Sequence, residues 1–181
     1  MQDRGIVRRI DELGRLVIPK EIRRVLRIRE GDPLEIYASK DQLVLKKYSP
    51  VCSLTEYAKS VADGIESLTE KTCFVTDCDA VIYASNSKYR EFEGQNLSEQ
   101  MEKILKERKS VMISRSDGGQ IVSIIKGNDM EAENQIIVPI ISNGDCYGAI
   151  ILFDKDKTAR FNAGDLNLLR LGTFFLSVYL D

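Results

Sequence analysis

The chain has 181 residues, of which 43% are hydrophobic and 30% are charged, as expected of a globular protein with one or two domains. It has no histidine, so imidazole-based triads, thiol–imidazole pairs and histidine metal sites are excluded. It also lacks an apolar run of membrane-spanning length, a secretory signal pattern and a phosphate-binding glycine loop. We therefore expect a cytoplasmic protein that is not an enzyme and carries no metal, no cofactor and no membrane segment.

Charge is distributed unevenly along the chain. Residues 1–50 carry twelve Lys and Arg against eight Asp and Glu, a net charge of +4. Because the whole chain has a net charge of −2, residues 51–181 carry −6. Such an asymmetry indicates an anionic partner for the N-terminal region.

The first predicted elements are two short strands, residues 5–10 and 15–19, joined by the turn sequence DELG. A second hairpin is predicted over residues 34–48, with its turn near Lys40 and Asp41. The N-terminal region therefore consists of two hairpins with a connecting segment between them.

A short helix is predicted in that connecting segment. Pro19 is acceptable at its first position, which needs no N–H donor, and a Gly-Asp-Pro sequence ends the segment. The spacing of Ile22, Val25 and Leu26 places these apolar residues on one face, which we expect to be buried.

The basic residues of the same helix fall on the opposite face at 100° per residue, and we call them the cationic ridge: Lys20, Arg23, Arg24 and Arg27. Such a ridge can neutralise phosphates, and guanidinium groups also bind guanine edges in the major groove. The alternative is a solvated face without a partner. Lys46 and Lys47, at the end of the second hairpin, either contact DNA or protect a strand edge.

Residues 1–50 are too few to bury a substantial core alone, and domains of this size commonly depend on oligomerisation. We expect a dimer in which the hairpins of two chains interleave.

The motif D-x-L-G-R-x-V-I-P-x-E-x-R-R, within residues 5–50, resembles the AbrB-type swapped-hairpin DNA-binding domain of bacterial transition-state regulators. The resemblance implies an intertwined homodimeric β-barrel that binds double-stranded DNA through Arg8, Arg15, Arg23 and Arg24. From the same basic cluster we add Arg9, Lys20 and Arg27 as candidate DNA-binding residues.

The second domain is predicted to begin after Pro50, where the charge balance changes. Helices are predicted over residues 54–68, 98–108 and 163–180, the last weakened by Gly172. Six apolar segments predict strands: residues 73–77, 81–85, 111–114, 120–125, 135–141 and 146–153. This order fits an α+β class, with an antiparallel sheet flanked by helices.

This domain, residues 51–181, is similar to a GAF domain, and the whole chain is similar to regulators of late forespore genes, placed by resemblance at the forespore nucleoid. GAF domains generally hold a small molecule, here under a polar lid of residues 85–98. The candidate lining residues are Tyr83, Tyr89, Phe92, Ser110 and Arg115, although core or surface roles are the commoner outcome for such residues. No ligand is identified.

The apolar helices at both ends of the second domain, residues 54–68 and 166–180, predict a second self-association and hence a homotetramer. In the latter helix Leu169 and Phe174 are the predicted contacts. Two alternatives to a transcription regulator remain: an antitoxin with a swapped-hairpin domain, and a methionine sulfoxide reductase that uses Cys73 and Cys78.

Overall fold

In the computed structural model, residues 6–127 and 131–180 are described. The chain divides into a first unit that ends at Tyr48, the head, and a second unit that begins at Ser49, the tail. The head contains α1 (Lys20–Val25), β1 (Leu34–Ser39) and β2 (Gln42–Lys47). The tail contains α2 (Pro50–Ser53), α3 (Thr55–Thr69), β3 (Thr72–Thr76), β4 (Val81–Ala84), the 3₁₀ helix η1 (Ser87–Phe92), α4 (Glu99–Glu107), β5 (Val111–Ser114), the 3₁₀ helix η2 (Arg115–Asp117), β6 (Asn134–Ser142), β7 (Asp145–Asp154) and α5 (Ala163–Ser177).

The predicted second hairpin of the head is confirmed. β1 and β2 pair antiparallel, and the register ends with Ser39 opposite Gln42. Lys40 takes a left-handed conformation in the turn, with φ of 49°. The turn therefore falls where the sequence places it.

The predicted helix is also confirmed, as α1. Pro19 was predicted at the first helical position, but it is the N-cap residue that precedes the helix, with φ of −57°, a value suited to the start of a helix. At the other end, the Arg27 N–H bonds the Arg24 carbonyl at 3.4 Å and the Ile28 N–H bonds the Arg23 carbonyl at 2.8 Å, the pattern of a Schellman motif. Arg27, with φ of 53°, therefore lies beyond the helix and does not continue the cationic ridge as a helical residue.

Residues 6–18 form no strand, so the prediction of strands at residues 5–10 and 15–19 is wrong for the single chain. Gly5 lies outside the described residues. A turn is closed by hydrogen bonds from the Asp11 N–H to the Arg15 carbonyl and from the Gly14 N–H to the Asp11 carbonyl. A strand needs a neighbouring strand for its backbone groups, and in the described part of this chain β1 and β2 pair only with each other.

The predicted burial of Val25 and Leu26 is wrong as well, since Val25 is 81% exposed. Of the described head residues 6–48, Pro19 alone is buried, and Ile22 is half-buried. Many large apolar side chains of the head are exposed: Ile6, Val7, Ile10, Leu13, Leu16, Val17, Val25, Leu26, Ile36, Tyr37, Leu43 and Val44. The head has almost no core of its own, because its apolar residues have no second layer to cover them.

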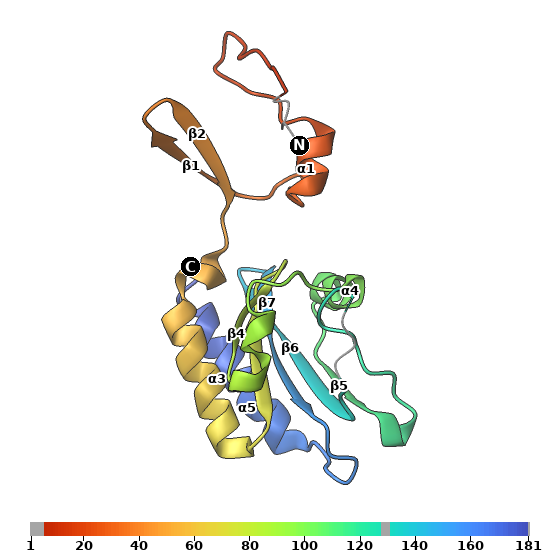
Figure 1. Ribbon diagram of the computed structural model, residues 1–181. Coiled ribbons are helices and arrows are strands. Elements are labelled where there is room, and N and C mark those ends of the chain that lie inside the picture. The colour runs from red at the N-terminus through yellow and green to blue at the C-terminus, as the bar shows by residue number, and fades with distance from the viewer. Residues whose placement is uncertain (1–5, 128–130, 181) are drawn as a thin grey trace. The chain divides into compact units, whose positions relative to one another are not determined.

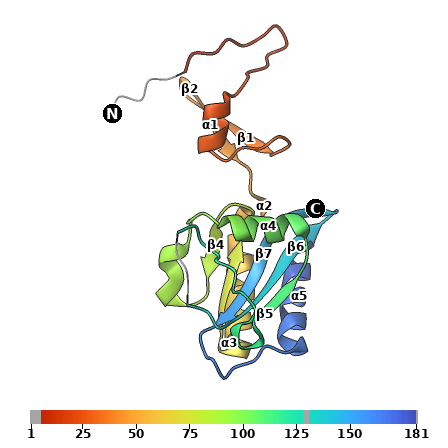
Figure 2. The same ribbon diagram turned by 90° about the vertical axis from the view of Figure 1, so that its right-hand side faces the viewer.

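The tail is built on a five-stranded antiparallel sheet in the order β4-β3-β7-β6-β5. Figure 1 shows α3 and α5 on one face of this sheet and α4 on the other, and Figure 2 shows the strands side by side in this order. The arrangement confirms the predicted antiparallel sheet with flanking helices. Among the described residues, no helix is both long and apolar enough to cross a bilayer.

The apolar runs of β6 and β7 are continuous because both faces of the sheet are covered. Alternate residues of β7 serve the two faces: Ile150 packs in a core with α3 and α5, and Ile151 packs in a core with α4 and η1. Both are fully buried. The tail thus has two cores, separated by one sheet.

One predicted strand of the tail is wrong. Residues 120–125 form no strand and contribute only an isolated bridge between Ile125 and Leu97. Ile124 and Ile125 are nevertheless buried in the core beside α4. The apolar segment therefore covers a sheet face as an irregular chain, which a run of hydrophobic residues does not distinguish from a strand.

α5 confirms the predicted terminal helix, but its residues are used differently. Leu169 is fully buried in the tail's own core, so it is not available for contact with another chain, whereas Phe174 is 66% exposed. Gly172 is buried where a Cβ would lie 2.9 Å from side-chain carbons of Ile150 and Val61. Its small size allows α5 to approach the sheet and α3 closely.

Candidate nucleic-acid interface

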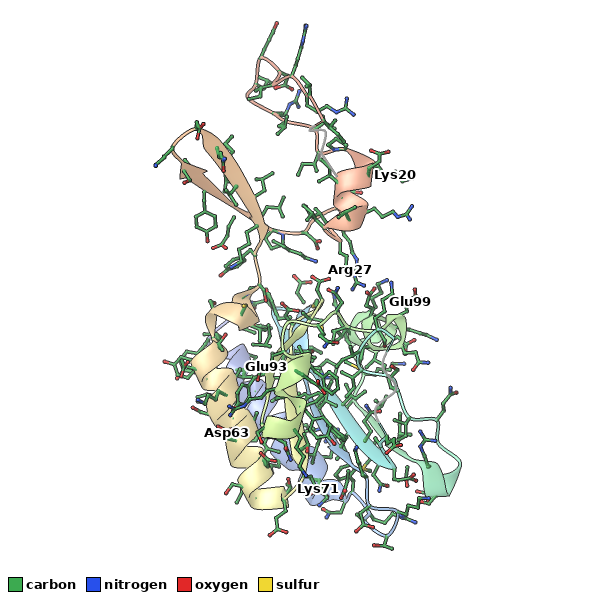
Figure 3. The ribbon with its side chains drawn as sticks, in the orientation of Figure 1. Lys20, Arg27, Asp63, Lys71, Glu93 and Glu99 are labelled. Carbon is green, nitrogen blue, oxygen red and sulfur yellow. The ribbon has the colours of Figure 1, made fainter. Side chains whose placement is uncertain are left out.

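The candidate DNA-binding residues come from three consecutive segments of the head. Six of the seven are exposed and Arg27 is half-buried: Arg8, Arg9, Arg15, Lys20, Arg23, Arg24 and Arg27. Lys20, Arg23 and Arg24 share α1, and Figure 3 shows Lys20 and Arg27 near the two ends of this helix. Arg8, Arg9 and Arg15 lie in the preceding segment, which has no strand partner.

Arg15 is held in place by Asp11. The Asp11 carboxylate accepts hydrogen bonds from the Arg15 backbone N–H at 2.8 Å and from its Nε at 2.7 Å, and also from the Leu13 N–H. These bonds from Arg15 lower the pKa of Asp11. The Arg15 side chain stays 71% exposed, so its remaining guanidinium donors can reach a partner.

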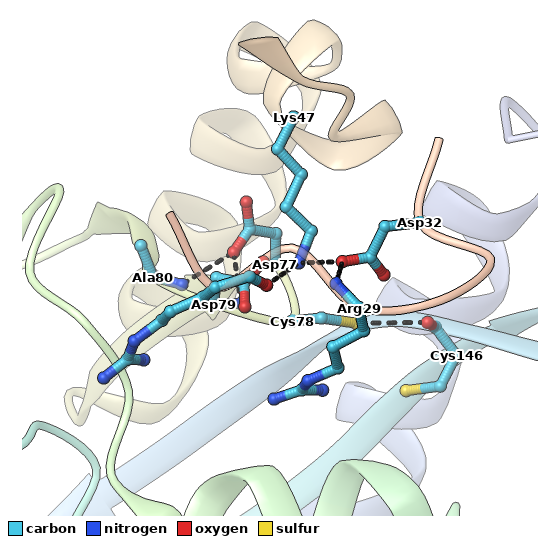
Figure 4. A network of polar contacts seen from close by, with 9 residues as sticks. Arg29, Asp32, Lys47, Asp77, Cys78, Asp79, Ala80 and Cys146 are labelled. Carbon is cyan, nitrogen blue, oxygen red and sulfur yellow. Dashed lines mark hydrogen bonds and ion pairs between the residues drawn. The ribbon is translucent and has the colours of Figure 1, made fainter. Parts of the chain in front are cut away.

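The connection between α1 and β1 is fixed by a second aspartate. Asp32 Oδ2 accepts a hydrogen bond from the Arg29 N–H at 2.7 Å and lies 3.0 Å from Lys47 Nζ (Figure 4). The side chains of Lys47 and Asp32 are only 23% and 20% exposed, and Lys47 Nζ also lies 3.5 Å from the Arg27 carbonyl. Lys47 therefore positions the segment that carries Arg27, a role that the sequence did not reveal, whereas Lys46 is exposed.

Neither aspartate was predicted as part of the site. Asp11 sits in the DELG turn and Asp32 in the Gly-Asp-Pro sequence, and aspartate in such turns commonly accepts hydrogen bonds from nearby backbone N–H groups. That signal was available locally for both residues. The local sequence gives no signal for the ion pair between Asp32 and Lys47, because that pair depends on the return of β2 beside the turn.

The candidate ligand residues of the tail are not brought together. Tyr83 packs in the core with α3 and α5, and its hydroxyl donates to Asp63 Oδ1 at 2.8 Å. Tyr89 and Phe92 lie in the core on the opposite face of the sheet. Ser110 is exposed, and the Arg115 Nε donates to the Ala132 carbonyl at 2.8 Å.

Under the predicted lid, aromatic side chains fill the core beside η1. The Tyr89 ring lies 5.2 Å from the Phe153 ring and 5.9 Å from the Phe74 ring, both edge-on. Phe74 and Phe153 are themselves 5.2 Å apart. The tail's own side chains thus occupy the position beneath η1.

The structure separates Cys73 and Cys78, the pair considered for redox catalysis. Cys73 is fully buried in the core with α3 and α5, and burial raises its pKa. The Cys78 Sγ instead donates to the carbonyl oxygen of Cys146 at 3.1 Å (Figure 4). Within residues 6–127 and 131–180, no group of three or more acidic or cysteine side chains is arranged to hold a metal ion.

Two sequence families match the chain. The family described as stage V sporulation protein T C-terminal, transcription factor, matches residues 53–180. The family described as antidote-toxin recognition MazE, bacterial antitoxin, matches residues 7–53.

Individual proteins add detail. The chain is 43% identical over 159 residues to stage V sporulation protein T of Bacillus subtilis (strain 168), an alignment that covers 87% of this chain and 88% of that protein. It is 54% identical over 57 residues to the transition state regulatory protein AbrB of the same organism, covering 30% of this chain and 59% of that protein. The AbrB relative supports the resemblance carried by the motif of the head.

Among solved structures, the GAF domain of a phosphoenolpyruvate-protein phosphotransferase from Acinetobacter aligns with a TM-score of 0.59 at 12% identity. The alignment covers 75% of this chain and 84% of that one. At this identity the likeness concerns the fold alone, and it confirms the GAF-like fold predicted for the tail.

Proposed function

The chain belongs to the stage V sporulation protein T family of transcription factors, and we propose that it regulates late sporulation genes of the forespore by binding double-stranded DNA. In this proposal residues 1–50 form the DNA-binding domain and residues 51–181 form a GAF-like domain for oligomerisation and sensing. The protein acts in the cytoplasm, at the forespore nucleoid, as an activator or a repressor.

The observation that carries the proposal is a cluster of exposed cations on an incompletely covered head. Arg23 and Arg24 lie on α1 with no residue of that helix buried, and Lys20 begins it. Exposed guanidinium groups neutralise phosphates and release counterions, and they can also form two hydrogen bonds to the edge of a guanine base. Arg8, Arg9, Arg15 and Arg27 extend the cluster to both sides of α1 in sequence.

Self-association of the head is the second part of the proposal. Exposed apolar residues precede α1 and recur in β1 and β2, where Ile36 and Leu43 are both 67% exposed. A second head would cover these side chains, and residues 6–18 would gain strand partners from its backbone. We infer an intertwined homodimer in which each head completes the other.

Association of tails is the third part. Leu171, Phe174 and Phe175 of α5 follow one another at helical spacing, Val178 directly after the helix continues the series, and all four are exposed. The residues that α5 buries in the tail, such as Leu169 and Leu176, lie on its other side. We infer that this second stripe contacts another tail, so that two head dimers join in a tetramer.

A small molecule in the tail would have to displace part of the aromatic cluster that contains Phe74, Tyr89 and Phe153. Native mass spectrometry of the protein as purified tests this proposal. A stoichiometric added mass that disappears on unfolding supports a sensing role, and the bare chain mass in every charge state contradicts a retained ligand.

An antitoxin is the second candidate, favoured by the MazE family match over residues 7–53. Antitoxins with such heads usually append a disordered segment that wraps the toxin. Here the tail folds around two cores of its own, which favours the transcription regulator.

DNA binding by the head is tested with the double substitution Arg23→Ala/Arg24→Ala. The variant is assayed on duplexes that the wild-type protein selects from a random-sequence pool. We expect binding to weaken at least tenfold, and the slope of log affinity against log salt to become shallower by about 0.9 for each phosphate that is no longer neutralised. The matched control, Lys103→Ala/Lys106→Ala, removes two exposed cations from α4 of the tail. Equal affinity in both double variants, or an affinity independent of salt, would contradict the proposal.

A further inference from the structure

Cys78 and Cys146 come together at one end of the tail's sheet. Cys78 lies in the connection between β3 and β4, and Cys146 lies near the start of β7. β3 and β7 are neighbours, and their pairing ends at Thr76 opposite Ala149. Just beyond, the backbones touch, since a Cβ on Gly148 would lie 1.9 Å from the Thr76 carbonyl oxygen.

A β-bulge directs Cys146 to its position. Ile140 of β6 pairs with Gly148 and Ile141 pairs with Cys146, so Tyr147 is the extra residue. Strict alternation would place Cys146 on the same face as Ile150, in the core with α3 and α5. Instead Tyr147 packs there, and Cys146 packs on the opposite face. The bulge therefore exchanges the faces of these two residues.

The contact between the cysteines is direct. Cys78 Sγ lies 3.1 Å from the carbonyl oxygen of Cys146, so its sulfur rests against the backbone of the other cysteine (Figure 4). A disulfide needs Cα atoms about 4.4–6.8 Å apart. The Cys78 sulfur touches the peptide group of Cys146, and the two thiols also interact with each other, so the two side chains are adjacent.

The surroundings make the two thiols unequal. A hydrogen bond from the Cys78 thiol to the ionised Cys146 sulfur lowers the pKa of Cys146 to about 7, and a backbone hydrogen bond from Gly148 and the charge of Arg108 act in the same direction, while burial opposes them. The hydrogen bond to Cys146, burial and the carboxylates of Asp77 and Asp79 raise the pKa of Cys78. Arg108 is also hydrogen-bonded to Asp145, at 3.4 Å.

The other cysteines differ in access and neighbours. Cys78 and Cys146 are half-buried, which leaves them open to a small reagent, whereas Cys73 is fully buried and Cys52 is exposed. We propose that Cys78 and Cys146 form a thiol oxidation site, at which a hydroperoxide converts the two thiols into a disulfide within one tail.

The hydroperoxide is the oxidant that takes up the two electrons released when the disulfide forms. The Cys146 thiolate attacks one peroxide oxygen, the O–O bond breaks, and the departing hydroxide or alkoxide takes up a proton. Cys146 becomes a sulfenic acid and the peroxide is reduced by two electrons. The Cys78 sulfur then loses its proton and attacks the Cys146 sulfur, the S–O bond breaks, and water leaves. One peroxide is consumed for each disulfide formed.

The experiment uses the reduced full-length protein treated with hydrogen peroxide, followed by alkylation, proteolysis and mass spectrometry. We expect two of the four thiols to be consumed in one Cys78–Cys146 disulfide within the chain, and thiol reagents to restore them. Cys73→Ser, the matched control, should oxidise at the wild-type rate. Cys78→Ser should accumulate a sulfenic acid at Cys146 that dimedone traps, and Cys146→Ser should oxidise at least tenfold more slowly.

A measurement on the unsubstituted protein guards against variants that fail to fold. The alkylation rate of Cys146 by iodoacetamide should rise with pH, reach half its maximum near pH 7, and exceed that of Cys78. The proposal is overturned if oxidation links different chains through Cys52, if all four thiols persist while Cys146 alkylates no faster than Cys73, or if Cys146→Ser forms disulfide at the wild-type rate.

Discussion

Arg27 occupies a backbone conformation that residues with side chains rarely adopt. Its φ of 53° places it in the left-handed region, at the position of the Schellman motif that glycine usually takes. That conformation costs about 1–2 kcal/mol for a residue with a Cβ. A local cost of this kind is often found where the side chain serves binding, and Arg27 is one of the candidate DNA-binding residues.

The substitution Arg27→Gly separates the cost of the backbone conformation from the contribution of the side chain to DNA binding. We expect the free energy of unfolding to rise by up to about 1 kcal/mol, because relief of the strain outweighs the greater freedom of glycine in the unfolded chain. DNA binding should weaken, and its salt dependence should become shallower by about 0.9 in slope for each phosphate that Arg27 neutralises. Urea unfolding at a fixed protein concentration and binding titrations measure both.

Arg27→Lys is the control, because it keeps both the charge and the strain. It should unfold like the wild-type protein and retain most of the phosphate contribution to binding. If Arg27→Gly binds DNA as tightly as the wild-type protein, Arg27 is not part of the interface.

Residue-level roles were the least predictable from the sequence. Tyr83 and Tyr89 look equivalent as aromatic residues near a strand, yet one packs against α3 and the other beneath η1, because the sheet lies between them. Similarly, Leu169 and Phe174 are both apolar residues of α5, but only Leu169 is buried within its own tail. Periodicity identifies apolar faces, but the side of the helix that meets its own sheet is set by tertiary packing.

At the scale of elements, two helical glycines have opposite environments. Gly64 lies in the middle of α3, where a Cβ added by substitution would have no neighbour within 4 Å. A Cβ on Gly172 of α5 would instead lie 2.9 Å from side-chain carbons of Ile150 and Val61. Alanine favours a helix over glycine by about 1 kcal/mol in both places. Overpacking a core typically costs about 1–3 kcal/mol, so at Gly172 alanine should lower the free energy of unfolding instead of raising it.

We therefore expect Gly64→Ala to stabilise the tail by about 0.5–1 kcal/mol and Gly172→Ala to destabilise it by about 1 kcal/mol. Chemical denaturation followed by far-UV circular dichroism gives both values, and each variant serves as the control for the other. Stabilisation by both substitutions would show that α5 does not rest closely on the sheet and α3.

The elements of the tail were largely predictable, and two of the head were not. β6 and β7 are long apolar runs because helices or irregular segments cover both faces of the sheet, and such runs are a strong signal. Residues 120–125 carry the same signal but cover a face without strand pairing. Residues 6–18 have the composition of strands, but pairing needs a partner that this single chain does not supply. For residues 120–125 the apolar composition therefore indicated burial correctly and strand pairing wrongly.

At the scale of the whole molecule, the two association surfaces that we propose differ in how far the fold of each unit depends on them. The head exposes apolar residues from Ile6 to Val44 and buries almost nothing, so its partner must complete its fold. The tail has complete cores, and among its exposed apolar residues those at helical spacing on α5 form the proposed stripe, with Leu171 and Phe174 about two-thirds exposed. Separating the tails should therefore leave the fold of each tail intact, whereas separating the heads should unfold them.

The last prediction uses this difference. Leu171→Asp/Phe174→Asp places two carboxylates in the α5 stripe without touching the core of the tail, and burying them against another tail would be costly. Light scattering should show that the mass falls from a tetramer to a dimer joined by the heads, with an unchanged circular dichroism spectrum. Because each head dimer then loses the effective concentration supplied by its partner, affinity should fall on a duplex with two binding sites and stay unchanged on a duplex with one.

Met112→Asp, at an exposed apolar residue of the edge strand β5, is the control and should remain a tetramer. A double variant that keeps the wild-type mass would rule out the stripe as an interface, and one that falls to a monomer would place the head dimer in doubt, since the heads should hold two chains together without the tails.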